Sequence, residues 1–402
     1  MRKNTRWDVA SVATIPLIIT LGNSMMIPVL PIMQRKLHIT AFQSSLVITA
    51  YSLIAIVLIP VAGFVSDRIG RKRVILPSFA ITAVGGLVAG MGASPFHSYA
   101  LVLAGRFLQG AGSAGAMPIA MPLVGDILKR DEEISKALGT IETANTFGKV
   151  LSPILGAVLA AWAFYLPFYA IPLLCVASAA MIMIFVRVPK RDKSNSHRPT
   201  SLPMLLALLR HHLRWLAAVF LVGATAMFVL FGTLVYFSDR LESDWNANGI
   251  SKGALLAIPL CCLCLASYGA GRIIGKNKRR MKYMVAGSCL LAGIGSAVAA
   301  LVFVTEWLMI AVCIIGIGIG GALPAVDALI TESMQKEQRG SITSVYTSTR
   351  FIGVAAGPPV VSLLSSRGQP SVFWLMALAC GLPALYSLWA IQAGTRGGKR
   401  EI

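Results

Sequence analysis

The chain has 402 residues, of which 56% are hydrophobic and 13% are charged, and its mean hydropathy is +0.74. A water-soluble domain cannot bury this much apolar surface, so the composition excludes the soluble classes of enzyme and binding protein. The formal net charge of +20 is of the kind found in nucleic-acid-binding proteins, and the placement of the basic residues decides whether it has that meaning here.

Twelve apolar segments follow one another along the chain, each long enough to cross about 30 Å of hydrocarbon. Backbone groups in lipid need hydrogen-bond partners within their own segment, and strand alternation is absent, so these segments are predicted to be helices. The predicted spans cover residues 9–30, 42–64, 74–93, 98–122, 137–161, 164–186, 215–238, 250–271, 283–304, 307–330, 341–364 and 372–394. The predicted fold class is therefore an all-α membrane protein.

The basic residues lie mostly on one side of the predicted spans. With the N-terminus inside, most of the 36 Lys and Arg side chains fall in cytoplasmic segments. The other side carries Arg35, Lys36, Arg240, Lys252 and Arg367. This asymmetry is the positive-inside rule of membrane proteins, so we expect cytoplasmic termini and no nucleic-acid partner.

The turn between the second and third predicted spans is glycine-framed and strongly cationic, as expected of a cytoplasmic loop. Its fixed residues are Gly63, Asp67, Arg68, Gly70 and Arg71. They resemble, at every fixed position, the Gly-x-x-x-Asp-Arg-x-Gly-Arg-Lys motif of the major facilitator superfamily. The first span, with Leu21–Asn23 and Ile27–Pro31, is similar to the drug:proton antiporter branch with twelve spans. The resemblance implies a major facilitator fold, with twelve transmembrane helices in two six-helix bundles.

The same resemblance implies a conformational latch around this turn. Asp67 is expected to meet the N-terminal end of the eleventh span, where the helix dipole favours a carboxylate. Arg71 is expected to pair with Asp126 at the inner end of the fourth span, and Arg339 to complete the network. The alternative is that these charges only set the topology of the chain. We interpret Asp126 and Asp327, both at inner helix ends, as structural acids.

The fourth span contains an arginine, Arg106, followed by Gln109 and Gly110. This Arg-x-x-Gln-Gly sequence resembles a second motif of the family, and the resemblance implies a role in proton coupling. An arginine in hydrocarbon costs at least about 2.5–3.5 kcal/mol, so the side chain is expected to face protein or a wet cavity. The alternative is a guanidinium that only binds backbone carbonyls.

Two predicted spans each carry a polar face. On the fifth span the face consists of Glu142, Asn145, Thr146 and Lys149, at the spacing of one side of a helix. On the eleventh span it consists of Thr343, Tyr346, Thr347 and Arg350. We expect these faces, with Asn23 of the first span, to line a central substrate cavity.

The charges of the predicted cavity bias its choice of substrate. The cations are Lys149, Arg350 and Arg106, and the comparable buried acid is Glu142, our candidate for the proton site. We therefore expect anionic or neutral amphipathic substrates, such as a drug, an antibiotic or a catechol- or carboxylate-bearing siderophore. The alternative is that Lys149 and Glu142 neutralise each other and leave an ordinary multidrug cavity.

Small residues on the fifth span predict close helix packing. Gly148, Ser152 and Gly156 recur every four residues, and Pro153 bends the helix. The pattern resembles a third family motif, Gly-x8-Gly-x3-Gly-Pro-x2-Gly-Gly, which marks antiporters, with serine and alanine replacing two glycines. A similar pattern in the eleventh span consists of Gly353, Gly357 and Pro358.

The predicted spans divide six and six around a polar interval at residues 187–214. We expect an N-terminal bundle over residues 1–187, a cytoplasmic basic linker over 188–213 and a C-terminal bundle over 214–402. Within the linker, Leu202–Leu209 is expected to form a short helix on the membrane surface.

The two halves also repeat a short sequence. Gly115–Pro118 in the fourth span matches Gly321–Pro324 in the tenth, and Pro153 lies near the position equivalent to Pro358. Parallel repeats with a site between them near the midplane are typical of secondary transporters.

Together these features predict proton-coupled efflux of a small amphipathic molecule by alternating access across the inner membrane of a bacterium. The expected partners are the substrate, protons and membrane lipids, and we expect a monomer without metal or cofactor. A uniporter or a nutrient importer is the alternative within transport. A membrane receptor or enzyme is disfavoured, because the sequence shows no soluble signalling domain and its 5 His have no metal-ligand spacing.

Overall fold

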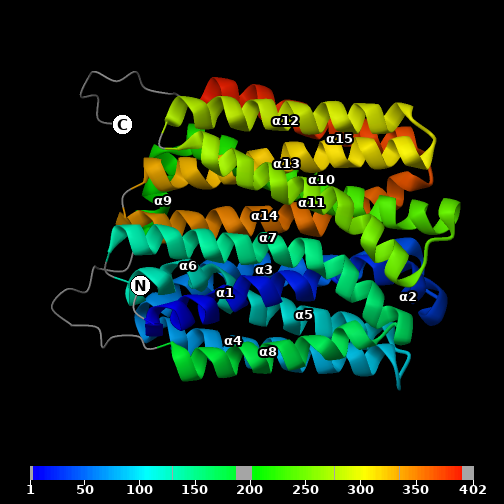
Figure 1. Cartoon of the computed structure of the whole chain (residues 1–402), viewed down its shortest axis with the longest axis horizontal. Helices are drawn as coiled ribbons and strands as arrows, with labels where there is room; N and C mark the ends of the chain where they lie inside the picture. The colour runs from blue at the N-terminus through cyan, green and yellow to red at the C-terminus, as the bar shows by residue number, and fades with distance from the viewer. Residues whose placement is uncertain (1–2, 129, 187–201, 276, 335, 392–402) are drawn as a thin grey trace.

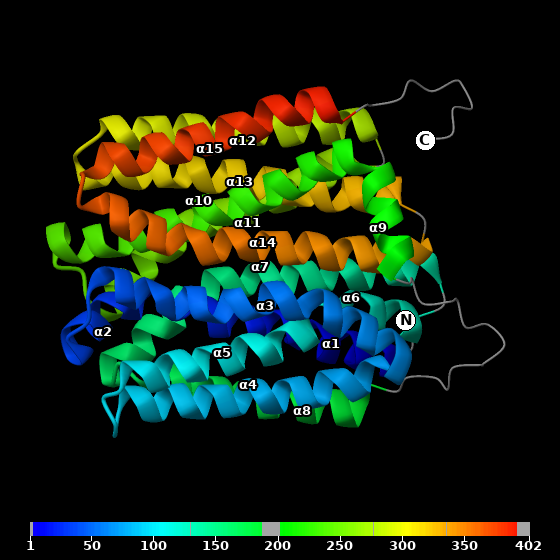
Figure 2. The same cartoon turned by 180° about the vertical axis from the view of Figure 1, so that it is seen from behind.

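The computed structural model describes residues 3–128, 130–186, 202–275, 277–334 and 336–391, and over these residues every regular element is a helix. The long helices lie side by side along one direction (Figure 1). The start of the first helix, the short helix α9 (Leu202–His211) and the end of the last helix lie at the same end of the molecule in both views (Figures 1 and 2).

The first half of the described chain consists of long and short helices with two 3-10 turns. They are α1 (Lys3–Ser24), η1 (Ile27–Val29), α2 (Leu30–Leu37), α3 (Ala41–Ile69), α4 (Arg71–Ala93), α5 (Tyr99–Ala116), η2 (Met117–Ile119), α6 (Ala120–Ile127), α7 (Asp131–Trp162) and α8 (Leu166–Phe185). Each 3-10 turn begins around a proline, Pro28 or Pro118, whose missing N–H interrupts the helical hydrogen bonds.

The second half contains the remaining helices. They are α9 (Leu202–His211), α10 (Leu213–Trp245), α11 (Gly249–Ile274), α12 (Lys278–Leu301), α13 (Thr305–Ser333), α14 (Lys336–Ser365) and α15 (Gln369–Ala390). Helix α9 corresponds to the short helix predicted inside the basic linker. Most of that linker, residues 188–201, lies outside the described residues, and the predicted boundaries of the two bundles stay a prediction.

Ten helical runs among the described residues are long and apolar enough to cross a membrane. One of them joins α1, η1 and α2 into a single run, Arg6–Leu37. The two remaining predicted spans correspond to α5–η2–α6 and to α14, which are also helical but carry more polar residues, including Arg106 and Arg350. The all-α membrane fold predicted from the sequence is confirmed.

The short sequence repeat has the same structural role in both halves. A Cβ on Gly115 of α5 would overlap the hydroxyl of Ser78 on α4, and a Cβ on Gly321 of α13 would overlap the hydroxyl of Ser288 on α12. In each pair the serine hydroxyl occupies the space that the glycine leaves open, and small residues of this kind let helices approach closely. The repeat is therefore a pair of equivalent helix contacts, one in each half.

The two halves meet along two seams. In the first, α3 packs on α14, and the Thr49 hydroxyl donates to the Ala355 carbonyl at 2.7 Å. In the second, α7 packs on α11, and a Cβ on Gly253 would lie 2.6 Å from the Pro153 carbonyl. These seams bring the polar faces of α7 and α14 into the interior between the halves.

Candidate functional site

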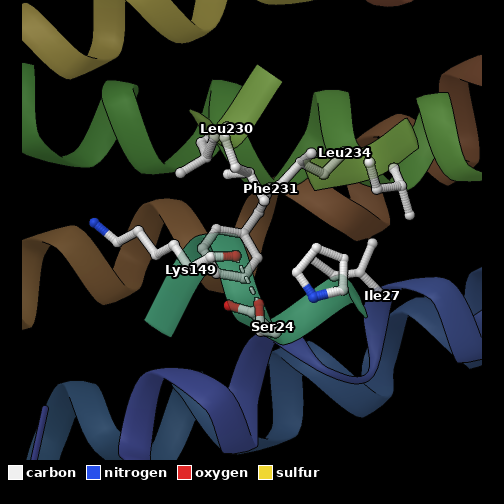
Figure 3. Close-up of a pocket in the computed structure, with 10 residues that line it drawn as sticks. Ser24, Ile27, Lys149, Leu230, Phe231 and Leu234 are labelled. Atoms are coloured by element: carbon white, nitrogen blue, oxygen red, sulfur yellow. Dashed lines mark hydrogen bonds between the residues drawn. The ribbon is translucent and has the colours of Figure 1, made fainter. Parts of the chain in front are cut away.

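A small pocket lies between the two halves (Figure 3). It is lined by Ser24, Ile27, Lys149, Ser152, Pro153, Leu230, Phe231, Leu234, Leu256 and Leu260. These residues come from α1, η1 and α7 of the first half and from α10 and α11 of the second half. Its enclosed space is about 10 Å³, room for roughly one water molecule, so the pocket is nearly closed in this structure.

Lys149 is the one charged residue among those that line this pocket. Its side chain is 8% exposed, and its amino group points away from the Ile27 and Leu234 end of the pocket (Figure 3). The remaining lining is mainly aliphatic and aromatic. Lys149 therefore borders the pocket with its backbone and stem, and its charge lies in the interior beside the pocket.

Charged residues from three helices surround Lys149. Its electrostatic neighbours are Glu142 on its own helix, Asp327 on α13 and Arg350 on α14. The guanidinium of Arg350 lies 5.6 Å from the centre of the Tyr346 ring. The cluster therefore contains two cations and two acids. The sequence predicted an excess of cations, because it placed Asp327 at a helix end and not in this cluster.

Asp327 lies inside the predicted tenth span, although its place near the end of that span led us to interpret it as a structural acid. Its electrostatic neighbours are Arg350, Glu142 and Lys149, and it comes from a helix whose sequence around it is apolar. An acid in such a segment is itself a signal of function. Hydropathy alone could not show which helices pack against it.

Glu142 is held in place by a chain of polar side chains that crosses to α1. The Asn145 amide donates to Glu142 Oε1 at 3.3 Å, and the Thr20 hydroxyl donates to Asn145 Oδ1 at 2.7 Å. The Thr146 hydroxyl donates to the backbone carbonyl of Glu142 at 2.8 Å. Asn145 therefore orients the Glu142 carboxylate, whereas Thr146 bonds the Glu142 backbone, and neither of these residues, both predicted to line the cavity, lines the pocket of Figure 3.

Arg106 lies apart from this cluster and is fully buried. It donates to the carbonyls of Val47 at 2.9 Å and Gly22 at 3.2 Å, and to the side chains of Asn23 at 2.9 Å and Gln109 at 2.7 Å. Among the described residues no carboxylate accepts a hydrogen bond from it. These contacts correspond to the interpretation in which the guanidinium binds backbone carbonyls, and they occupy Asn23, which was predicted to face the cavity.

Three residues predicted to form the latch, Asp67, Arg71 and Asp126, meet where α3 ends, α4 begins and α6 ends. Arg71 contacts Asp67 at 2.9 Å and Asp126 at 2.8 Å, so the predicted pair with Asp126 is present. Gly70, with φ of 103°, forms the break between α3 and α4 in a conformation that favours glycine. Arg339, near the start of α14, donates instead to the carbonyl of Met334 in the connection before this helix, at 2.9 Å.

Two further residues of this motif lie on α3. A Cβ on Gly63 would lie 3.0 Å from Ser344 Oγ on α14, so this glycine faces the other half. The Arg68 guanidinium lies 4.1 Å from the centre of the Phe64 ring. The motif thus combines a contact between the halves with an ion-pair network in the first half.

The predicted packing stripes contact the helices that line the pocket. On α7, Gly148 and Gly156 face the Leu17 and Met25 carbonyls of α1 and the turn after it, and the buried Ser152 hydroxyl donates to the Lys149 carbonyl at 2.9 Å. The corresponding residues of α14 face α10: these are Gly353, against the Ala224 carbonyl, and Gly357, against the Phe228 carbonyl. Pro153 and Pro358 both lie inside their helices.

Comparison with known proteins identifies the family. The family model of the Major Facilitator Superfamily matches residues 12–358 and 294–401. The Bacillibactin exporter of Bacillus subtilis (strain 168) is 46% identical over 388 residues, covering 94% of each chain. The Tetracycline resistance protein, class B, of Escherichia coli is 23% identical, covering 96% of this chain and 98% of that protein.

A solved structure has the same fold. The human organic anion transporter MFSD10 (TETRAN) superposes with a TM-score of 0.73 at 18% identity, covering 95% of this chain and 99% of that one. The resemblance noted from the motifs is therefore confirmed at the level of sequence and of fold. This chain belongs to the Major Facilitator Superfamily and is a membrane transporter rather than an enzyme.

Proposed function

We propose that this protein exports a small amphipathic molecule across the cell membrane in exchange for protons, and that anionic or neutral substrates such as a siderophore or a drug are favoured. The likeness to the Bacillibactin exporter supports export and a siderophore as the first substrate to test. The structural observation that carries the substrate preference is Lys149, a buried cation whose stem borders an apolar pocket and whose charge lies beside it in the interior between the halves.

The arrangement of the halves supports alternating access. The pocket takes its lining from both halves, so rocking one half against the other would expose it first to one side of the membrane and then to the other. The latch residues Asp67, Arg71 and Asp126 would stabilise one of these states. The basic turns near the termini support a cytoplasmic location for that end, and we infer a monomer surrounded by membrane lipid.

The charged cluster supports proton coupling. Glu142 and Asp327 are the acids next to Lys149 and Arg350, so a proton on either acid would change the balance of charge around the substrate site. We propose Glu142 and Asp327 as the candidate proton carriers. Arg106, which contacts neither acid through a hydrogen bond, would act by positioning α1, α3 and α5.

Proton movement in inverted membrane vesicles tests the function. An inside-acid gradient is imposed, and bacillibactin is added beside matched anionic, neutral and cationic amphiphiles. We expect bacillibactin and the anionic panel to collapse the gradient. Collapse by cations alone would contradict the substrate preference and keep antiport. Transport of labelled bacillibactin without proton movement would indicate the uniporter or importer instead.

Substitution of the pocket lysine tests its role in this assay. Lys149→Met keeps the length of the side chain and removes its charge, so we expect at least a tenfold loss of response to anionic substrates, about 1.4 kcal/mol of binding. Lys136→Met, on an exposed part of the same helix, is the matched control and should respond as wild type. Equal responses of the two variants would contradict the assignment of Lys149.

A further inference from the structure

An ion-pair cluster joins the two halves at the end of the molecule opposite to the start of α1 and the end of α15 (Figure 1). Arg35, in the last turn of α2, contacts Glu242 near the end of α10. Lys252, near the start of α11, donates to the other oxygen of Glu242 at 2.7 Å. One carboxylate therefore binds one cation from each half of the chain.

The two cations differ sharply in exposure. The Lys252 side chain is 2% exposed and Glu242 is 13% exposed, whereas Arg35 is 59% exposed. Asp239, one turn earlier on α10, is a second electrostatic neighbour of Lys252. A buried lysine needs an acid partner permanently, because an unpaired buried charge costs several kcal/mol. Lys252 and Glu242 therefore form a fixed pair within the second half, and Arg35 is the partner that can leave.

Helix spacing connects this cluster to the pocket. On α10, the positions four residues apart along one face are Leu234, Ser238 and Glu242. On α11, they are Leu260, Leu256 and Lys252. Leu234, Leu256 and Leu260 line the pocket, so the cluster lies two turns beyond the pocket wall on α10 and one turn beyond it on α11.

Between the pocket and the cluster, the halves are in contact again. The Ser238 hydroxyl donates to the carbonyl of Ile27 at 3.4 Å, and Ile27 itself lines the pocket. Ser238 is 1% exposed. The route from the pocket to this end of the molecule is therefore closed by two successive contacts, Ser238 with Ile27 and then Glu242 with Arg35.

We propose that Arg35, Glu242 and Lys252 form the outer gate of the transport route. Lys252 holds Glu242 in position within the second half, and Arg35 of the first half closes on it when the pocket is shut from the outside. When the halves separate at this end, Arg35 leaves with α2 while Glu242 keeps its lysine partner. The gate rests on the proposed function, because it needs the two halves to rock and the termini to be cytoplasmic.

Labelling of a buried reporter cysteine tests the gate without substrate or a proton gradient. Ser238→Cys is placed in a chain whose seven native cysteines are replaced, and intact cells receive a membrane-impermeant maleimide. We expect Arg35→Gln to accelerate labelling about two- to fivefold, the effect of removing a partly exposed ion pair. Lys36→Gln makes the same charge change one residue further along and should leave the rate unchanged. Leu234→Cys is a second reporter one turn deeper.

A double substitution shows whether the two residues act through each other. If they do, Arg35→Gln should have no further effect on labelling in a Glu242→Gln background. The gate would be overturned if Arg35→Gln left the labelling rate unchanged in a chain that keeps Glu242. It would also be overturned if Arg35→Gln and Lys36→Gln changed the rate equally.

An exposed reporter separates failure of the gate from failure of the proposed function. Ser251→Cys, on the surface of the same end, should be labelled from outside in every variant. If Ser251→Cys is labelled but the labelling rate of Ser238→Cys does not change with Arg35→Gln, the gate is overturned and the proposed function is not. No labelling of Ser251→Cys would place this end in the cytoplasm and overturn both the orientation and the outer gate.

Discussion

Arg106 shows how a single residue can organise one half of a transporter. Its guanidinium binds the Gly22 carbonyl and the Asn23 side chain of α1, the Val47 carbonyl of α3 and Gln109 of its own helix. Because arginine is planar and has five donors, it can satisfy several acceptors at once in fixed directions. A lysine, with a compact ammonium group, cannot reproduce this fork.

Arg106→Lys tests this residue-scale role. We expect the variant to lose several of these hydrogen bonds, at a cost of about 3 kcal/mol or more, and to have a melting temperature lower by ~5 °C or more in detergent. The measurement is the monodisperse fraction after heating, read by size-exclusion chromatography. Arg272→Lys, which keeps charge at an exposed site, is the control and should melt like wild type. Equal melting of both variants would contradict the organising role.

At the scale of helices, glycine contacts bring together the helices that line the pocket. Gly353 and Gly357 of α14 face backbone atoms of α10, and Gly148 and Gly156 of α7 face α1 and the turn after it. In the membrane, helices associate through close packing rather than through the hydrophobic effect, so small residues at these positions have a large influence. The two pairs of helices are equivalent in the two halves.

Gly353→Ala tests this packing. The new methyl group would overlap the Ala224 carbonyl, so α14 must move away from α10, and we expect a destabilisation of about 1–3 kcal/mol, read as a lower melting temperature. Gly340→Ala lies on the same helix, where a Cβ would meet nothing within 4 Å. That control should be neutral or slightly stabilising, since alanine favours a helix over glycine. The packing argument fails if Gly353→Ala melts at or above wild type.

At the scale of the whole molecule, the halves are connected near both ends. Near one end Gly63 of α3 lies against Ser344 of α14, beside the latch. At the other end Arg35 contacts Glu242. Alternating access requires that contacts at the two ends open in turn. A bulky side chain that keeps one end from closing should therefore shift the equilibrium between the two states of the transporter rather than unfold it.

Gly63→Leu tests this expectation. The leucine side chain would collide with Ser344, hold the halves apart at that end and lower the export rate by about tenfold, within the range of overpacking effects. Export is measured as efflux of labelled bacillibactin from loaded cells, with protein amount checked on the same samples. Gly125→Leu, near the same end but with no atom within 4 Å of a Cβ, is the control. Similar export rates for Gly63→Leu and Gly125→Leu would contradict the expectation that a side chain at position 63 holds the halves apart.

The fold was predictable from sequence to a greater extent than the site. Runs of apolar residues predict spans because the bilayer sets their length, and the pair of Arg71 with Asp126 follows from a motif. The contacts of Arg106 were not predictable, since backbone carbonyls leave no signature in a sequence. Arg35 and Glu242 are 207 residues apart, and neither has a motif. Asp327 was recognisable as a polar residue in a span, yet its neighbours depend on packing between helices.

The contacts of Arg106 also have a consequence for biosynthesis. Gly22, Asn23 and Val47 all precede Arg106 in the chain, and Gln109 follows it by three residues. Because the chain enters the membrane from its N-terminus, the helices that supply these acceptors leave the ribosome before the arginine does. Arg106 therefore reaches the bilayer after its partners on α1 and α3, and the order of synthesis itself shortens the time that this charge spends without them.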